Sequence, residues 1–156
     1  MDLTKITNFI KEGAKTLNIK KWDFGASFSN DFSVQIDKGI AKQLKASQKQ
    51  VLTLRVWNDN DLVGITTTSD LSEIGLKKAL FQANLASEYG NKNEKTDFSP
   101  LSKDPIKSLN IKRINPSGIT KLLKVLRIAE TNLLKKHEAI KSIPYNGLSE
   151  SFFKRV

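Results

Sequence analysis

An α+β fold, with a mainly antiparallel meander sheet and three helices packed largely on one face, is the architecture that this sequence predicts. The apolar residues follow a helical period near the start of the chain, a period of two from about residue 22 to residue 68, and a helical period again in two later segments. Short turn sequences separate the period-two segments, so neighbouring strands should be antiparallel. The 156 residues, 38% of them hydrophobic, suit one domain that spans residues 1–156.

The three helices are expected over residues 4–18, 73–89 and 117–136. In the first, apolar side chains recur every three or four positions, at Ile6, Phe9, Ile10, Ala14 and Leu17. The second follows a capping signal in which Ser69, Ser72 and the pair of Asp70 with Glu73 are all suitable caps, and Gly90-Asn91 is a typical stop. The third follows Pro116-Ser117 and carries a leucine-rich apolar face.

The strands are expected between Trp22 and Thr68, separated by four polar turn sequences at residues 29–31, 37–39, 47–49 and 58–61. The Asn, Asp and Gly residues of these turns tolerate the left-handed backbone that tight hairpins require. The sequence therefore predicts several short strands that follow one another as a meander.

A long polar loop is expected over residues 90–118, which contain three of the four Pro residues. Loops of this length inside a domain are usually functional or mobile, and this one is expected either to close over a cleft or to be a surface excursion. Residues 148–156 look like the beginning of another element, and the chain then ends on apolar and cationic residues. Such an end is typical of a fragment of a longer protein or of a frayed terminus.

The composition excludes several classes of protein. Without Cys and with a single His, the chain has no disulfide framework, no thiolate zinc site and no Cys nucleophile. No apolar run approaches the roughly 18 residues of a membrane span, and the start of the chain lacks the hydrophobic segment of a secretory signal. We therefore expect a cytoplasmic protein with no membrane partner.

The net charge of +10 is concentrated near the C-terminal end, where residues 101–156 hold 12 Lys and Arg against 4 Asp and Glu. This excess indicates an anionic partner or, more simply, a solvated Lys-rich surface, because only four of the cations are Arg. Aromatic residues lie around the strands rather than among the cations, which disfavours nucleic acid. The candidate basic surface comprises Lys112, Arg113, Lys121, Lys124, Arg127, Lys135 and Lys136.

The segment from Val51 to Ala86 resembles the N-terminal domain of the TldD/PmbA family. The resemblance rests on Leu54-Arg55-Val56, the polar turn at residues 58–61, Gly64, the run at residues 67–72, and the helix end at residues 82–86. Residues 32–40 and 140–144 also resemble segments of that family, so the resemblance covers nearly the whole chain. The Thr-Ser-Asp-Leu-Ser run at residues 68–72 is closer to the PmbA branch than to the TldD branch.

The TldD/PmbA family consists of bacterial metallopeptidases that are also described as modulators of DNA gyrase and as peptide-maturation proteins. Its peptidases carry zinc on an HExxxH helix in the later part of a longer chain. Here the only His-Glu pair is His137-Glu138, and Lys141 or Ser142 stands where a second His is needed. The resemblance therefore implies a non-catalytic domain with no cofactor of its own, the zinc being supplied by a C-terminal part or by a partner subunit.

The resemblance also implies partners, namely a peptide substrate in the intact assembly and a second family member in a homo- or heterodimer. Proteins of the PmbA branch resemble the family's partner subunit, which lacks the complete zinc motif. The other function that we consider, in which the domain contacts nucleic acid or modulates gyrase, would use the basic surface.

The candidate cleft or partner contacts are Arg55, Trp57, Thr67, Thr68, Ser69 and Asp70. Arg55 lies among apolar strand residues, where it would bind a substrate carboxylate, contact a subunit or pair with an acid of its own sheet. Trp57 would be a partner anchor or a packed rim residue. The hydroxyls and N–H groups at residues 66–70 would hold an anion or simply cap the next helix.

Overall fold

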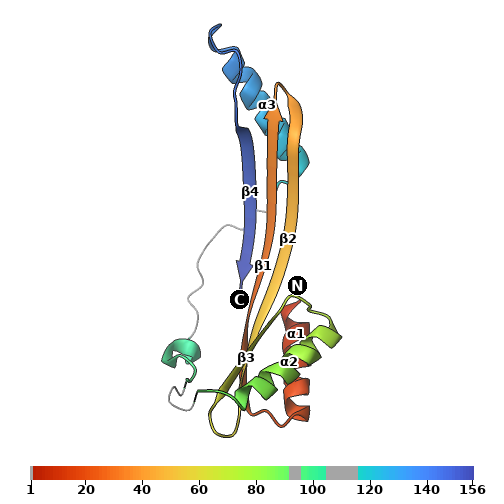
Figure 1. Ribbon diagram of the computed structural model, residues 1–156, viewed down its shortest axis with the longest axis vertical. Coiled ribbons are helices and arrows are strands. Elements are labelled where there is room, and N and C mark those ends of the chain that lie inside the picture. The colour runs from red at the N-terminus through yellow and green to blue at the C-terminus, as the bar shows by residue number, and fades with distance from the viewer. Residues whose placement is uncertain (1, 92–95, 105–115) are drawn as a thin grey trace. The chain divides into compact units, whose positions relative to one another are not determined.

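The computed structural model describes residues 2–91, 96–104 and 116–156, and it confirms the α+β class. Four strands form one antiparallel sheet in the order β3-β2-β1-β4 (Figure 1). The described residues group into two compact units, which are described in turn. The elements, in chain order, are α1 (Leu3–Thr16), β1 (Lys21–Asp37), β2 (Ile40–Trp57), β3 (Val63–Thr68), α2 (Glu73–Ser87), the short 3-10 helix η1 (Pro100–Lys103), α3 (Ile119–Leu134) and β4 (Asn146–Arg155).

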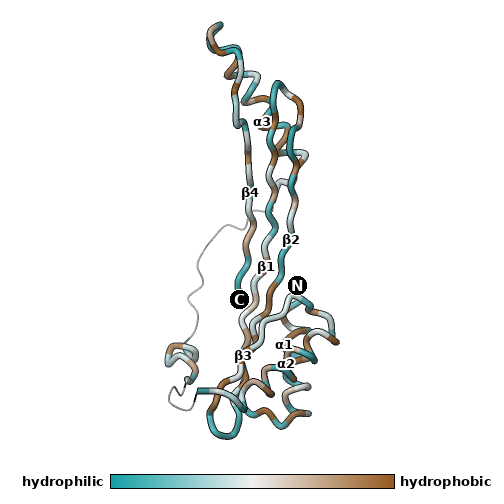
Figure 2. The backbone as a smooth tube through the Cα atoms, in the orientation of Figure 1, coloured by the Kyte–Doolittle hydropathy of each residue, from teal (hydrophilic) through white to brown (hydrophobic). Residues whose placement is uncertain are grey.

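Unit 1 comprises the described residues of 1–27, 50–111 and 155–156. Its core lies between one face of the sheet and the two helices α1 and α2, and the apolar part of β2 lies at this core (Figure 2). Alternate residues of β2, Leu52, Leu54 and Val56, are 0% exposed because the period of a strand sends them all toward the helices. The buried cluster consists of Ile6, Ile10, Ala14, Ile19, Leu52, Leu54, Val56, Leu76, Leu80 and Ala83.

Unit 2 comprises the described residues of 28–49 and 112–154. The turn between β1 and β2 has positive φ at Lys38 (49°) and Gly39 (74°), as a two-residue hairpin of type I′ requires. Helix α3 packs on β1 through a smaller buried cluster of Val34, Ile36, Leu122 and Leu126.

Helix α3 also holds the hairpin turn by its polar side chains. Glu130 is only 4% exposed, and its carboxylate accepts the backbone N–H groups of Lys38 at 3.0 Å and Gly39 at 2.6 Å. The Nε of Arg127 donates to the Gly39 carbonyl at 3.0 Å. The turn's backbone groups are thus satisfied by a helix some 90 positions later in the chain.

The strands are longer than expected, and two predicted turns are wrong. Residues 29–31 and 47–49 lie inside β1 and β2, whereas the turns at residues 37–39 and 58–61 are present. The polar side chains mistaken for turn formers contact one another on the strands, since the hydroxyls of Ser29 and Ser47 lie 3.4 and 3.5 Å from Asp31 Oδ2. Residues 148–156, expected to begin another element, belong to β4 and its end.

The helices lie where they are expected, with ends that differ by up to two residues. Ser72 is the N-cap of α2, and its hydroxyl accepts the N–H of Gly75 at 3.1 Å. Helix α3 begins after Gly118 without a side-chain cap, and the N–H of Ser117 donates to Glu150 instead. The predicted loop at residues 90–118 contains η1, and its residues 92–95 and 105–115 lie outside the described residues.

Candidate functional site

One face of the unit 1 sheet, opposite the helices, carries a group of polar and aromatic side chains that contact one another. Pairing of β2 with β3 places Thr53 opposite Thr67, Arg55 opposite Ile65 and Trp57 opposite Val63. Because side chains alternate along a strand, Thr53, Arg55 and Trp57 share one face, while Leu52, Leu54 and Val56 face the core. We call this surface the open face of unit 1.

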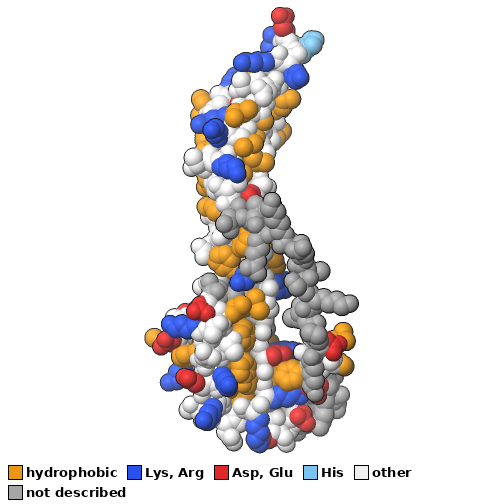
Figure 3. Space-filling model, turned by 180° about the vertical axis from the view of Figure 1, so that it is seen from behind, with side chains coloured by type: hydrophobic (Ala, Val, Ile, Leu, Met, Phe, Trp, Pro, Cys, Tyr) orange, Lys and Arg blue, Asp and Glu red, His pale blue; other side chains and the backbone are white. Residues whose placement is uncertain are grey.

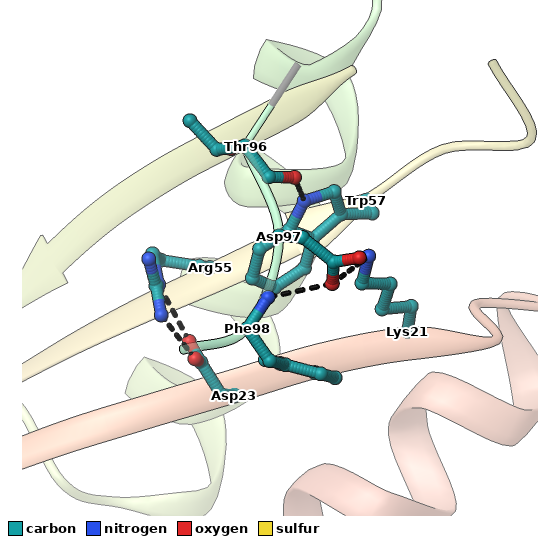
Figure 4. Close-up of polar contacts among 7 residues, drawn as sticks. All are labelled: Lys21, Asp23, Arg55, Trp57, Thr96, Asp97 and Phe98. Atoms are coloured by element: carbon teal, nitrogen blue, oxygen red, sulfur yellow. Dashed lines mark hydrogen bonds and ion pairs between the residues drawn. The ribbon is translucent and has the colours of Figure 1, made fainter. Parts of the chain in front are cut away.

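Arg55 is paired with an acid of the neighbouring strand β1. Its Nε donates to Asp23 Oδ1 at 2.8 Å and its Nη2 donates to Asp23 Oδ2, so the pairing is bidentate (Figure 4). The Asp23 carboxylate raises the pKa of Arg55 above its ordinary value, mainly through this hydrogen bond. The two side chains are 38% and 32% exposed, so solvent screens the pair and it contributes on the order of 1 kcal/mol at most.

The guanidinium of Arg55 keeps donors to spare. Asp23 accepts from Nε and Nη2, and within the described ranges no further residue accepts from this five-donor group, which is partly exposed. The Cζ of Arg55 also lies 5.1 Å from the ring centroid of Trp57. The arrangement can therefore present a fixed cation to a carboxylate or carbonyl oxygen.

Trp57 is covered by a segment from much later in the chain. It is only 2% exposed, and its Nε1 donates to the carbonyl oxygen of Thr96 at 2.8 Å. The ring of Phe98 meets the ring of Trp57 edge to face, with centroids 5.1 Å apart. Figure 4 shows both contacts on the side of the sheet where Arg55 lies.

Lys21 completes this cluster from β1. Its Nζ lies 5.0 Å from the Trp57 centroid, 5.2 Å from the Phe98 centroid and 2.6 Å from Asp97 Oδ1. The same Asp97 oxygen accepts the N–H of Phe98 at 2.6 Å. One ammonium group thus contacts two rings and a carboxylate, a geometry suited to cation–π attraction.

A shallow hollow of about 220 Å³ lies on unit 1 beside Thr53. Gly25 lies in its lining, and a Cβ added there would have the carbonyl oxygen of Val156 as its nearest neighbour, at 3.7 Å. The hollow is lined by Gly25, Ala26, Ser27, Val51, Thr53, Arg155 and Val156.

The six predicted contact residues divide into two groups. Arg55, Trp57 and Thr67 belong to the strand positions of the open face, and the Thr67 and Thr53 hydroxyls lie 3.2 Å apart. Thr68, Ser69 and Asp70 form the turn into α2, where Thr68 Oγ1 accepts the N–H of Asp70 at 3.1 Å. Asp70 Oδ1 in turn accepts the N–H of Ser72 at 2.9 Å, so this group organises the helix start.

Sequence reasoning missed Lys21, Asp23 and the segment at residues 96–98. Lys21 and Asp23 alternate along β1, and this signal alone would have placed them on one face. Their contacts with Arg55 and Trp57 depend on how β1 pairs with β2, and the wrongly predicted turns at residues 29–31 and 47–49 obscured that pairing. Residues 96–98 carry no periodicity that would place them on the sheet.

The predicted basic residues that the structure describes belong to unit 2. Lys121, Lys124, Lys135 and Lys136 are exposed, whereas Arg127 is engaged with the hairpin turn. Val125 and Ile128 are also exposed and lie next to Lys124 and Arg127 in the sequence. Figure 3 shows blue and orange side chains intermingled over this unit. Lys112 and Arg113 lie outside the described residues.

The described part of the chain offers neither a metal cluster nor a membrane-spanning helix. In residues 2–91, 96–104 and 116–156, no three His, Asp or Glu side chains gather as a metal site would require. His137 Nδ1 accepts the N–H of Ala139 at 3.1 Å, which engages one ring nitrogen locally. No helix in the same ranges combines the length and the hydropathy needed to cross a bilayer.

Comparison with solved structures shows which fold this is. A candidate modulator of a DNA gyrase from Thermotoga maritima superposes with a TM-score of 0.65 at 13% identity, over 99% of this chain and 35% of that one. TldE from Thermococcus kodakarensis gives 0.61 at 13% identity, over 96% and 34%. A candidate modulator of DNA gyrase from Bacteroides thetaiotaomicron gives 0.64 at 16% identity, over 98% and 36%.

The chain has the fold of these proteins and spans about a third of their length. No protein-family model matches the sequence, and no curated protein matches it either. The likeness is therefore one of backbone architecture, and it extends over nearly the whole of this chain.

Proposed function

We propose that this chain acts as the non-catalytic N-terminal part of a TldD/TldE-like assembly and supplies a surface for peptide substrate or for a second subunit. The observation that carries the proposal is the fold likeness, which takes in almost all of this chain and a third of each neighbour. Because a fold by itself does not define a function, the chemistry of the site must support the same role. The sequence resemblance to the N-terminal domain of this family supports the same role.

The chemistry of the open face supports binding rather than catalysis. Arg55 with Asp23 and Lys21 with Asp97 present fixed charges on a sheet surface, and Trp57 with Phe98 adds a packed aromatic contact. Partly exposed Arg and aromatic side chains, here Arg55 and Phe98, are typical of protein interfaces. We assign the zinc of the assembly to a C-terminal part or to a partner subunit, and we place the assembly in the cytoplasm.

Co-expression with a TldD-type protein that carries the HExxxH motif tests this proposal. We expect a stable complex by light scattering, and no cleavage of an unfolded peptide by the present chain alone with or without a chelator. Arg55→Ala should weaken the association by about fivefold or more, as for a modest interface hot spot. Lys78→Ala, a matched change of an exposed cation on α2, should leave it unchanged.

Two results would overturn the proposal. One is chelator-sensitive cleavage of the peptide by the purified chain alone, since that would make the chain a peptidase itself. The other is the absence of association both with the zinc-bearing protein and between copies of this chain, because a positioning domain needs a subunit to position.

A further inference from the structure

Residues 96–98 cover Trp57, and they contact the sheet through three different chemical groups. The Thr96 carbonyl accepts the indole N–H, the Asp97 carboxylate pairs with Lys21, and the Phe98 ring packs against Trp57. Each group meets a matching group on β1 or β2, as Figure 4 shows. The sheet thus binds a backbone carbonyl, an acid and an aromatic ring in three consecutive residues.

We infer that Lys21 and Trp57 form a recognition site for an extended peptide in which an acidic residue precedes an aromatic one, and that residues 96–98 occupy this site as a tethered copy of that ligand. The inference rests on the proposed function in one respect, because it takes the open face of unit 1 as a peptide-binding surface. It narrows the class of peptide to acidic–aromatic segments. A peptide supplied by another chain takes the site by displacing residues 96–98.

The tethered segment is held by contacts that a competitor can replace. The Asp97 side chain is 75% exposed and Phe98 is 38% exposed, so the ion pair is screened by solvent and the ring is only partly buried. A tethered ligand nevertheless competes at an effective concentration on the order of millimolar. A free peptide therefore binds the unaltered chain weakly and binds more tightly when the tethered copy is weakened.

Trp57 fluorescence measures occupancy of the site directly. In a Trp22→Phe background, Trp57 is the only indole of the chain. We expect Phe98→Ala to increase acrylamide quenching of Trp57. The peptide acetyl-Lys-Thr-Asp-Phe-Ser-Pro-amide, which copies residues 95–100, should then bind this variant at least about tenfold more tightly than the unaltered chain and restore protection.

Three controls define the specificity. Phe81→Ala removes another phenylalanine of unit 1, 56% exposed, and should change neither quenching nor peptide affinity. A peptide with Asn and Ala in place of Asp and Phe should not bind. Adding Lys21→Ala to Phe98→Ala should reduce the affinity for the original peptide several-fold, because the carboxylate then loses its cation.

The proposal fails if the Phe98→Ala variant keeps Trp57 as protected as before, if it binds neither peptide at millimolar concentration, or if it binds both equally. Should Phe98→Ala lose its fold by circular dichroism, Asp97→Ala weakens the same segment and is judged by the same readings. These outcomes are distinct from a failure of the proposed function, since that is judged by subunit association and not by Trp57.

Discussion

At the scale of single residues, several carboxylates of this chain accept hydrogen bonds from backbone N–H groups. Asp2 accepts the N–H of Lys5 at the start of α1, Asp70 accepts that of Ser72 before α2, and Glu130 accepts two from the hairpin turn. Hydrogen bonds to an ionised acceptor are stronger than those to a neutral one. The charge of each carboxylate therefore stabilises a particular local backbone conformation.

Asp70 should make the stability of the protein depend on pH. The hydroxyl and the backbone N–H of Ser72 hold the pKa of Asp70 below its ordinary value. Its folded pKa is lower than its unfolded pKa, so the stabilisation is present above the unfolded pKa and is lost as the pH falls through the folded pKa. We expect Asp70→Asn to be less stable than the unaltered chain at neutral pH and to match it in strong acid, as measured by urea unfolding at several pH values. An equal difference at every pH would contradict this account.

Glu130 should be required for its two acceptor oxygens. In Glu130→Gln the amide nitrogen cannot accept a hydrogen bond, so one of the N–H groups of Lys38 and Gly39 faces another donor. At a position only 4% exposed, we expect this to cost about 1–3 kcal/mol of unfolding free energy. Chemical denaturation measures the loss, and Glu138→Gln at an exposed position is the control, expected within about 0.5 kcal/mol of the unaltered chain.

Residue-scale reasoning from the sequence is most useful where the chemistry is local. The sequence predicts the capping chemistry before α2, although three caps are equally suitable and the structure selects Ser72. It predicts that Arg55 meets either a ligand or an acid, and the structure pairs Arg55 with Asp23. The identity of that acid depends on strand register, which a single strand's sequence does not contain.

At the scale of elements, the contact of α2 with β3 depends on one glycine. A Cβ placed on Gly64 would lie 2.0 Å from the carbonyl oxygen of Ala83 and 2.4 Å from the N of Ser87, both backbone atoms of α2. Backbone atoms in a helix cannot move aside without displacing the helix. The close approach buries Gly64 and allows Ala83 to reach 0% exposure.

Gly64→Ala should therefore be strongly destabilising. We expect a loss of about 3 kcal/mol, at the upper end for overpacking, because the clash is with backbone rather than with a flexible side chain. Thermal and urea unfolding measure it. Gly25→Ala is the matched control, since its added Cβ would meet its nearest atom at an ordinary 3.7 Å. A loss under about 0.5 kcal/mol in Gly64→Ala, as for an ordinary surface change, would show that α2 does not pack on β3 in this way.

The strands are the elements that sequence patterns describe least well. Residues 29–31 and 47–49 have turn composition but continue as strand, because pairing along the hairpin satisfies their backbone groups and their side chains contact one another. Turn propensity is a local preference of a few tenths to about 1 kcal/mol. The continuous backbone hydrogen bonds between two paired strands outweigh it. The predicted turns at residues 37–39 and 58–61 are confirmed; of these, Lys38, Gly39 and Asp61 adopt positive φ.

At the scale of the whole molecule, the two units differ in how much apolar surface they bury. Among the residues that the structure describes, the cluster of unit 1 contains ten buried residues and that of unit 2 contains four. We expect unit 2 to open more readily, because opening free energy follows buried apolar contact. Hydrogen exchange should find the amides of Leu52, Leu54 and Val56 more protected than those of Val34 and Ile36. Equal protection would mean that the chain opens as a single cooperative unit.

Salt dependence separates the proposed function from nucleic-acid binding. The exposed cations of unit 2 should give only weak association with DNA or RNA, of the non-specific kind that is in the range of about 1–100 μM at physiological salt. Replacing Lys121 and Lys124 with Ala should reduce the slope of log affinity against log salt by about two. Nanomolar binding at low salt that weakens steeply as the salt concentration rises would favour nucleic acid as the partner over a peptide or a subunit.

Local patterns in the sequence predict the α+β class, the positions of three helices and two of the turns, and they place Arg55 and Trp57 on strands. These follow from periodicity and capping, which act between residues a few positions apart. The length of β1 and β2, the pairing of Arg55 with Asp23 and the covering of Trp57 by residues 96–98 emerge only when the chain has folded. Those features depend on register and on contacts between residues 32 and 39 positions apart, where local preference carries no information.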